Sequence, residues 1–305
     1  MPTAPRLTPS RLFQQRATGI GIALMLCVAA SGGRAAAIEQ PVAIPAHPLD
    51  TEATGIATLG GLLWPQAQPG PHRAIVLMHG CAGLYARDGS ITARHRDWAE
   101  RFAAAGFVVL HVDSFGPRGQ RSICSDRSRS ILPGRERARV AYAALRFLQA
   151  RPDIRSDAIA LLGWSNGGSS VLAVVAERSV ARPPDLAHDF AAAVAFYPGC
   201  RALADARQAW HTAVPLLVLS GALDDWTPAR HCERLAERAA GSGSALELKI
   251  YDGAFHDFDA PDMKLHVRRN VATTASRTAT LGTDDKARAD AIQRVPEFLG
   301  RYIGR

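Results

Sequence analysis

The chain of 305 residues is long enough for one large α/β domain, and its composition excludes a disordered protein. Hydrophobic residues make up 47% and charged residues 21%, so the chain can bury a sizeable core. The formal charge of +8 suits an anionic partner such as nucleic acid or a membrane surface, which is the first expectation to test.

Residues 1–37 have the pattern of a secretory signal peptide. Basic residues precede the first acidic one, Glu39, and an apolar run extends from Ile20 to Ala30. The small residues of the segment 31–37 then offer a cleavage site, which we expect after Ala37. The apolar run is about a dozen residues long, too short to span a bilayer comfortably, although an uncleaved anchor is the alternative. We therefore predict a periplasmic or secreted protein with no stable membrane anchor after cleavage.

Cleavage would remove half of the positive charge. Four arginines would leave with the segment and no acidic residue, so 32 basic residues would face 28 acidic ones, a formal charge of +4. The remaining basic residues are scattered, apart from a denser stretch over 118–139, and no zinc-finger or aromatic-plus-basic motif is present. We predict no nucleic-acid partner, and we expect a monomer.

Apolar runs alternate with helical patterns through the rest of the chain. We interpret 38–52 as an N-terminal extension, and we expect a leading antiparallel pair of strands within Glu52–Trp64. Continuous apolar runs are typical of parallel strands that are covered on both faces. Such runs occur at Ala74–Met78, Phe107–Val112, Ala158–Leu162, Ala192–Tyr197, Leu216–Leu219 and Leu246–Tyr251.

Helical periodicity fills the segments between these runs. Trp98 and Phe102 share one helical face ahead of a capping glycine, Gly106, and Ala141 and Leu145 share another. Further helices are predicted over 169–177, 228–240 and 283–303, the last with a kink near its proline. This alternation predicts one α/β domain over 53–305, a doubly wound, mostly parallel sheet with helices on both faces. The short stretch 198–214 leaves no room for a large lid domain.

The sequence Gly163-Trp-Ser-Asn-Gly-Gly168 follows one of these strands and opens a helix. In that setting Gly-x-Ser-x-Gly predicts a nucleophile elbow, because the sharp turn brings strand and helix so close that glycines must flank the serine. Ser165 would then stand at a helix N-terminus, where backbone N–H groups favour negative charge. An ordinary glycine-rich turn is the alternative.

A serine nucleophile needs a base, and the base needs an orienting acid. In a strand–helix domain of this kind, acid and base should follow the serine in that order, each just after a strand. Asp224 follows the run 216–219 and His256 follows the run 246–251. Asp225 is the competing acid, and we expect Asp252, Asp257 and Asp259 to be solvated, turn-forming loop residues.

Two backbone N–H groups should form the oxyanion hole. Asn166 supplies one, because it directly follows the nucleophile, and the loop His79-Gly-Cys-Ala-Gly-Leu84 supplies the other, which we assign to Cys81. His79 would order this loop. The thiol of Cys81 is a rival nucleophile, but no helix N-terminus activates it. We expect no metal and no cofactor.

Four cysteines remain beyond the signal segment: Cys81, Cys124, Cys200 and Cys232. Four cysteines allow three pairings, and the residues alone do not choose among them. None of them forms the close Cys-x-x-Cys pair of a zinc site or a redox motif. In an oxidising compartment an even number makes disulfides plausible, and buried thiols are the alternative.

The motifs in combination resemble the dienelactone hydrolase family of α/β-hydrolases. The resemblance is carried by the loop 79–84, the segment 113–119, the elbow 163–168, and the stretches 221–228 and 251–258, and it covers roughly residues 53–303. It implies that the family's nucleophile, acid and base correspond to Ser165, Asp224 and His256. The best-known members carry cysteine in place of Ser165 and glutamate near Gly80. These differences favour general ester or lactone hydrolysis over dienelactone itself.

The resemblance also implies a pairing of the cysteines. In the family's sheet the strands that precede Cys81 and the Cys124 loop are neighbours, and so are those that precede Cys200 and Cys232. We therefore expect disulfides Cys81–Cys124 and Cys200–Cys232, the first of which would stiffen the oxyanion loop.

These observations predict a serine hydrolase that acts on a small-molecule ester or lactone. Arg118 and Arg121 leave a strand end beside the predicted site, where they are candidates for holding a substrate carboxylate, with surface solvation as the alternative. A peptidase or acyltransferase on the same triad is a second enzymatic reading. The non-enzymatic alternative is a binding protein that has a hydrolase fold but no catalytic activity.

Overall fold

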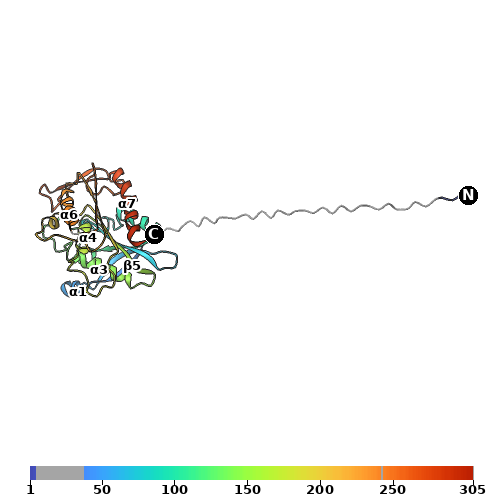
Figure 1. The fold of residues 1–305 in the computed structure, drawn as a ribbon, viewed down its shortest axis with the longest axis horizontal. Helices are drawn as coiled ribbons and strands as arrows, with labels where there is room; N and C mark the ends of the chain where they lie inside the picture. Colours follow the sequence, from blue (N-terminus) through green and yellow to red (C-terminus); the bar gives the residue numbers. More distant parts are fainter. Residues whose placement is uncertain (5–37, 242, 305) are drawn as a thin grey trace. The chain divides into compact units, whose positions relative to one another are not determined.

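A central eight-stranded sheet organises the chain, in the order β1-β2-β4-β3-β5-β6-β7-β8. Figure 1 labels β5, an inner strand of this sheet, together with several of the helices. The structure is a computed structural model that describes residues 1–4, 38–241 and 243–304, so the predicted signal peptide and its cleavage site lie outside the described residues. The strands are β1 (Gln40–Pro45), β2 (Thr58–Trp64), β3 (His72–Met78), β4 (Val108–Asp113), β5 (Ile154–Trp164), β6 (Ala192–Phe196), β7 (Leu216–Gly221) and β8 (Leu246–Tyr251).

Strands β3 to β8 are parallel, and β1 and β2 are added antiparallel at one edge. All six predicted apolar runs form these parallel strands, which confirms the predicted α/β fold. The antiparallel pair differs from the expectation, because β1 at Gln40–Pro45 pairs with β2, and the helix α1 (Pro48–Thr54) lies between them. Prolines at both ends of this six-residue strand conceal it in the sequence, yet an edge strand tolerates them because one side needs no ladder hydrogen bonds.

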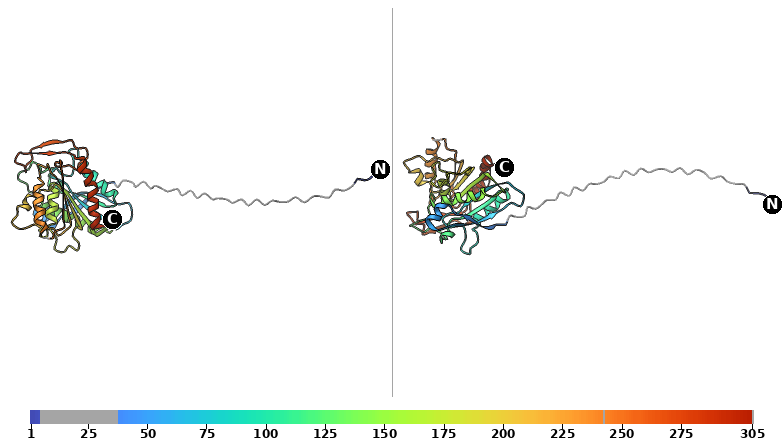
Figure 2. Two further views of the ribbon diagram at one scale, coloured as in Figure 1. Left: turned by 45° about the horizontal axis from the view of Figure 1, so that its top comes forward. Right: turned by 90° about the horizontal axis from the view of Figure 1, so that it is seen from below.

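Helices cover both faces of the sheet. On one face, α3 (Glu136–Gln149), α4 (Asn166–Val174) and α6 (Arg230–Ala240) pack against the sheet, with short α5 (Arg201–Ala204) beside α6. On the other face lie α2 (Ala93–Ala104) and α7 (Asp285–Ile303). Figure 2 shows α7, in red, across the sheet from α4 and α6. In the part of the chain that the structure describes, no helix is long and apolar enough to cross a membrane.

The segment between β8 and α7 contains a feature that the sequence did not predict. Strands β9 (His266–Arg269) and β10 (Thr278–Leu281) form an antiparallel hairpin outside the main sheet. Strand β9 is largely exposed, with Val267 56% exposed, whereas β10 buries Ala279 and Leu281. At four residues each, the strands are too short for their pattern to mark them in the sequence. The short helix Gly116–Arg118 follows β4. The loops after β3, β4, β5, β7 and β8 all leave the same edge of the parallel strands, and they carry the predicted site.

Candidate active site

Ser165 lies at the sharp turn between β5 and α4. Its φ of 53° is a left-handed backbone conformation that is costly for a residue with a side chain. Gly163 and Gly167 make the turn possible, because a Cβ on Gly163 would collide with the Gly167 carbonyl and one on Gly167 with the Met78 carbonyl. The Ser165 amide donates to the Phe196 carbonyl at 2.9 Å, which ties the strained residue to β6.

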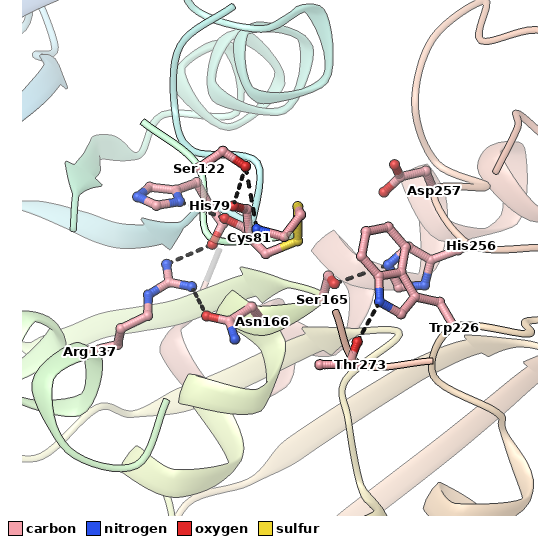
Figure 3. Close-up of a disulfide and its surroundings, with 12 residues drawn as sticks. His79, Cys81, Ser122, Arg137, Ser165, Asn166, Trp226, His256, Asp257 and Thr273 are labelled. Carbon is pink, nitrogen blue, oxygen red and sulfur yellow. Dashed lines mark hydrogen bonds between the residues drawn. A yellow bond between two sulfur atoms is a disulfide. The ribbon is translucent and has the colours of Figure 1, made fainter. Parts of the chain in front are cut away.

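The structure brings His256 and Asp224 together with this serine. His256 Nε2 lies 3.0 Å from Ser165 Oγ, and its Nδ1 lies 2.7 Å from Asp224 Oδ2. His256 and Asp224 are both buried, whereas Ser165 keeps 8% of its surface exposed. Figure 3 shows the His256 ring turned toward Ser165. The serine, the imidazole and the carboxylate therefore form one continuous hydrogen-bonded chain that is open at the serine end.

The loop after β7 fixes the acid. Asp224 Oδ1 accepts from the amides of Trp226 and Thr227, each at 2.8 Å, and the Thr227 hydroxyl donates to Asp224 Oδ2 at 2.9 Å. Asp225 points elsewhere and accepts from the amide and hydroxyl of Thr280 on β10. The geometry thus separates the two candidate acids, with Asp224 at the histidine and Asp225 at the hairpin.

Two aromatic rings flank the catalytic histidine candidate. The ring centroids of Tyr197 and Trp226 lie 4.4 Å and 4.8 Å from that of His256. Burial by itself lowers the pKa of His256, but the charge of Asp224 and its hydrogen bond outweigh burial, so the pKa is raised above its ordinary value. An imidazole held in this way readily accepts a proton from the serine.

The loop after β3 lies directly against the serine. A Cβ on Gly80 would lie 3.6 Å from Ser165 Cβ. No hydrogen bond among the described residues occupies the backbone amide of Cys81 or of Asn166. His79 orders the loop, since its Nδ1 lies 2.8 Å from the Gly80 carbonyl and its Nε2 accepts from the Ser114 amide at 3.0 Å. Both predicted oxyanion donors are thus unused and adjacent to the nucleophile.

Both expected disulfides are present, Cys81–Cys124 and Cys200–Cys232. The first lies beside Ser165 (Figure 3). Because the sulfur of Cys81 is bonded to that of Cys124, it has no thiol with which to act as the rival nucleophile. The disulfide instead joins the oxyanion loop to the loop that follows β4, and the amide of Ile123 reinforces the junction by donating to the Cys81 carbonyl at 2.9 Å.

Asp257 and Asp259 are not the solvated loop residues that we expected. Asp259 is fully buried and accepts from the indole N–H groups of Trp98 and Trp164, each at 2.8 Å, and from the Tyr197 hydroxyl. Asp257 pairs with Arg94 from α2. The expectation was wrong because apolar neighbours from α2 and β5 enclose the loop, and these distant contacts leave no local sequence signal. Together these residues form a buried polar network behind His256.

The two candidate arginines for substrate binding have internal partners. Arg118 donates to the buried Asp50 carboxylate at 2.6 Å, a pairing that disfavours a substrate contact. Arg121 donates to the carbonyls of Ala86 and Arg87 and lines a cavity of about 220 Å³ beside the oxyanion loop. Contact of either arginine with a substrate stays a prediction, and Arg121 is the better placed of the two.

Sequence reasoning missed several residues of this site. Thr227 and Trp226 lie within three residues of Asp224, so a turn in which an aspartate side chain accepts from backbone amides was a detectable signal. Arg137 was detectable as well, because it occupies the apolar face of α3 four residues before Ala141, a position where a charge is unusual.

Comparisons with known proteins bear on the family and the fold. Residues 59–303 match the dienelactone hydrolase family, whereas a search of curated proteins finds no match. The esterase 2 of Thermogutta terrifontis, solved as phosphorylated by paraoxon, covers 80% of this chain and 89% of its own at 19% identity, with a TM-score of 0.57. A dienelactone hydrolase-like promiscuous phosphotriesterase from metagenomic libraries covers 87% of this chain and 98% of its own at 17% identity, with a TM-score of 0.59.

A peptidase shares the fold as well. Dipeptidyl peptidase 4 of Porphyromonas gingivalis is 14% identical, with a TM-score of 0.60, over 88% of this chain but only 36% of its own. At such identities the likeness to solved structures shows the fold alone. The family match extends over most of the chain and agrees with the sheet topology. The chain therefore belongs to the dienelactone hydrolase family.

Proposed function

We propose that this protein is an exported serine hydrolase that cleaves a carboxylic ester or lactone of a small or soluble substrate. The observation that carries the proposal is the hydrogen-bonded chain from Ser165 Oγ through His256 to Asp224. Membership of a hydrolase family over residues 59–303 supports it. No metal or cofactor takes part in the proposed reaction.

The mechanism follows from the roles of the three side chains. Ser165 Oγ attacks the acyl carbon while His256 Nε2 accepts its proton, and Asp224 stabilises the imidazolium through Nδ1. The amides of Cys81 and Asn166 donate to the oxygen that becomes negative. His256 then protonates the leaving alkoxide, which leaves an acyl-enzyme on Ser165. Water then attacks the acyl carbon while His256 accepts its proton. His256 returns the proton to Ser165 Oγ as the acid is released.

Two features of the site bear on the substrate class. A cavity of about 220 Å³ lies at the end of the oxyanion loop, lined by Leu84 and Arg121 but not by Ser165, and Arg121 is a candidate partner for a substrate carboxylate. The segments that follow β4 and β8 surround Ser165, and none of the described ones forms a large lid domain. These features favour a small or soluble ester over a long lipid.

Two disulfides support export to the periplasm or the medium, because such bonds persist in oxidising compartments. The proposal includes cleavage of a signal peptide after Ala37, no nucleic-acid partner and a monomeric protein. Peptidase or acyltransferase chemistry on the same triad is the alternative. Peptide anilides, which are amide substrates, therefore belong in the substrate panel.

The test is covalent labelling by a fluorophosphonate probe, followed by a substrate panel. We expect one label per wild-type chain, located on Ser165 by peptide mass spectrometry, and none on S165A. Chromogenic esters of increasing acyl length and simple lactones should be hydrolysed faster than peptide anilides. Absence of labelling, or labelling that persists in S165A, would contradict the proposal, and faster cleavage of the anilides would favour the peptidase.

A further inference from the structure

A buried arginine lies next to the candidate oxyanion hole without a counter-ion. Arg137, in the first turn of α3, is 0% exposed, and none of the ion pairs formed among the described residues includes it. Burial and the nearby charge of Arg118 together lower the pKa of Arg137 to about 9, and the charge of Asp113 offsets them only in part. The guanidinium therefore remains charged at neutral pH.

The two hydrogen bonds of Arg137 reach both halves of the hole. Its Nη1 donates to the side-chain oxygen of Asn166 at 2.7 Å, and its Nη2 donates to the His79 carbonyl at 2.6 Å (Figure 3). Asn166 carries one oxyanion amide, and His79 stands two residues before Cys81, which carries the other. One planar group thus spans two segments that meet only in the folded chain.

A purely structural role accounts poorly for a charge at this position. Burying a charge away from water without a counter-ion is unfavourable, and both acceptors of Arg137 are neutral. The other buried residues of α3, such as Ala138, Ala141 and Leu145, are apolar and fill the same face. The side chain also lies over the Phe115 ring, 5.0 Å from its centroid, a contact that adds attraction but no counter-charge.

We infer that Arg137 is the positioning residue of the oxyanion hole, a role that rests on the proposed serine-hydrolase function. Its planar guanidinium, which donates from Nη1 and Nη2, fixes the amides of Cys81 and Asn166 relative to each other. Its positive charge, on the hole side of Ser165, favours the negative charge that develops on the substrate oxygen. Both effects act on the transition state more than on the bound substrate, so they affect kcat more than KM.

The test compares kinetics and melting temperature across variants of the full oxidised protein. Removing one oxyanion donor typically costs about 10²–10³-fold in kcat, and Arg137 acts through two such donors, so we expect R137M to lose about 10²-fold. Its KM should stay within about threefold, because uniform substrate binding is not affected. R137K keeps the charge but not the planar pair of N–H donors, and its kcat should lie between those of R137M and the wild type.

Y142F is the matched control. Tyr142 lies on the same helix, is equally buried and donates to the Val174 carbonyl at 3.0 Å. Y142F should lower the melting temperature, as R137M does, yet leave kcat unchanged. Should R137M fail to fold, N166A decides, because it removes the Arg137 acceptor while keeping the backbone amide. It should lower kcat by about tenfold, since a positioning contact is lost but no oxyanion donor.

The outcomes separate this inference from the proposed function. Wild-type protein that is labelled at Ser165, together with a folded R137M whose kcat is within about twofold of wild type or whose loss lies only in KM, would overturn the role of Arg137 alone. An N166A kcat equal to that of the wild type would overturn it as well. Wild-type protein that is not labelled would overturn the proposed function itself.

Discussion

Two neighbouring aspartates after β7 show how the surroundings of a residue determine its role. Asp224 and Asp225 are adjacent in sequence, yet the first is 3% exposed and hydrogen-bonds to His256, whereas the second is exposed and holds the hairpin. The difference comes from the turn that encloses Asp224 with the amides of Trp226 and Thr227. The same substitution, aspartate to asparagine, should therefore lower kcat by different amounts at the two positions.

We expect D224N to lower kcat by about 10⁴-fold, because the amide no longer holds His256 in the tautomer that accepts the serine proton. D225N should lower kcat by less than about tenfold, since it only weakens the contact with Thr280. Steady-state kinetics on a chromogenic ester measure both. Equal losses in the two variants would contradict the assignment of Asp224.

The raised pKa of His256 predicts the pH dependence of the reaction. The base is active when neutral, so kcat/KM should rise with pH through a midpoint above 6.5, the ordinary value for histidine. Asp257 also raises the pKa of His256 and Arg94 lowers it, so D257N, which leaves Arg94 unpaired, should shift the midpoint downward. A wild-type midpoint below 6.5 would contradict this expectation.

At the scale of elements, the site depends on three loops that are fastened by different bonds. The elbow between β5 and α4 is held by close backbone packing, the loop after β7 by hydrogen bonds to Asp224, and the loop after β3 by the Cys81–Cys124 disulfide. Of these three, only the disulfide is a covalent bond. The second disulfide, Cys200–Cys232, serves as a comparison for it. Cys200–Cys232 closes a sequence separation of 32, against 43 for Cys81–Cys124.

Removing either disulfide should lower the free energy of unfolding by about 2–4 kcal/mol. The double variant C81A/C124A should in addition lose about tenfold in kcat, because the oxyanion amide of residue 81 becomes less well positioned. C200A/C232A should keep its kcat. Thermal melts and kinetics on the two variants provide the measurement, and equal kcat values in both would show that the first disulfide is only a structural staple.

At the scale of the whole molecule, the described part of the core contains three buried histidines besides His256. His79, His95 and His111 are at most 1% exposed, and neither ring nitrogen of His111 has a hydrogen-bond partner among the described residues. His111 packs against His95 and Trp164. Burial, together with the charges of Arg94 and Arg137, lowers the pKa of His111 to about 3, and burial lowers those of His79 and His95 well below their ordinary value.

This arrangement predicts a loss of stability in mild acid. A histidine that is neutral when folded binds a proton only after unfolding, so its stabilising effect is complete above pH 6.5 and is lost as the pH falls toward about 3. Each such group contributes up to about 1.4 kcal/mol per pH unit. H111F should flatten the dependence of unfolding free energy on pH, measured by urea titration. An unchanged slope would contradict the prediction.

The sequence predicted those parts of the molecule that local pattern determines. The six parallel strands follow from continuous apolar runs, and the order of Ser165, Asp224 and His256 follows from their places after strands. Long-range contacts determine the rest. Burial of Asp259 depends on indole groups that α2 and β5 contribute, and Arg137 acquires its partners only when α3 packs against the elbow. The β9–β10 hairpin stayed hidden because each of its strands has only four residues, and the burial of Ala279 and Leu281 in β10 depends on distant neighbours such as Trp226.

The β9–β10 hairpin joins one wall of the site to the loops that carry the candidate catalytic residues. One end of its segment is fixed where His256 bridges Leu281, and the chain re-enters the sheet layers at Asp284, the N-cap of α7. Between the strands, the amide of Ala272 donates to the Cys124 carbonyl, and Thr273 accepts from the Trp226 indole. A change in this segment would therefore act on the loops that carry His256, Trp226 and Cys124, and through them on the walls of the site.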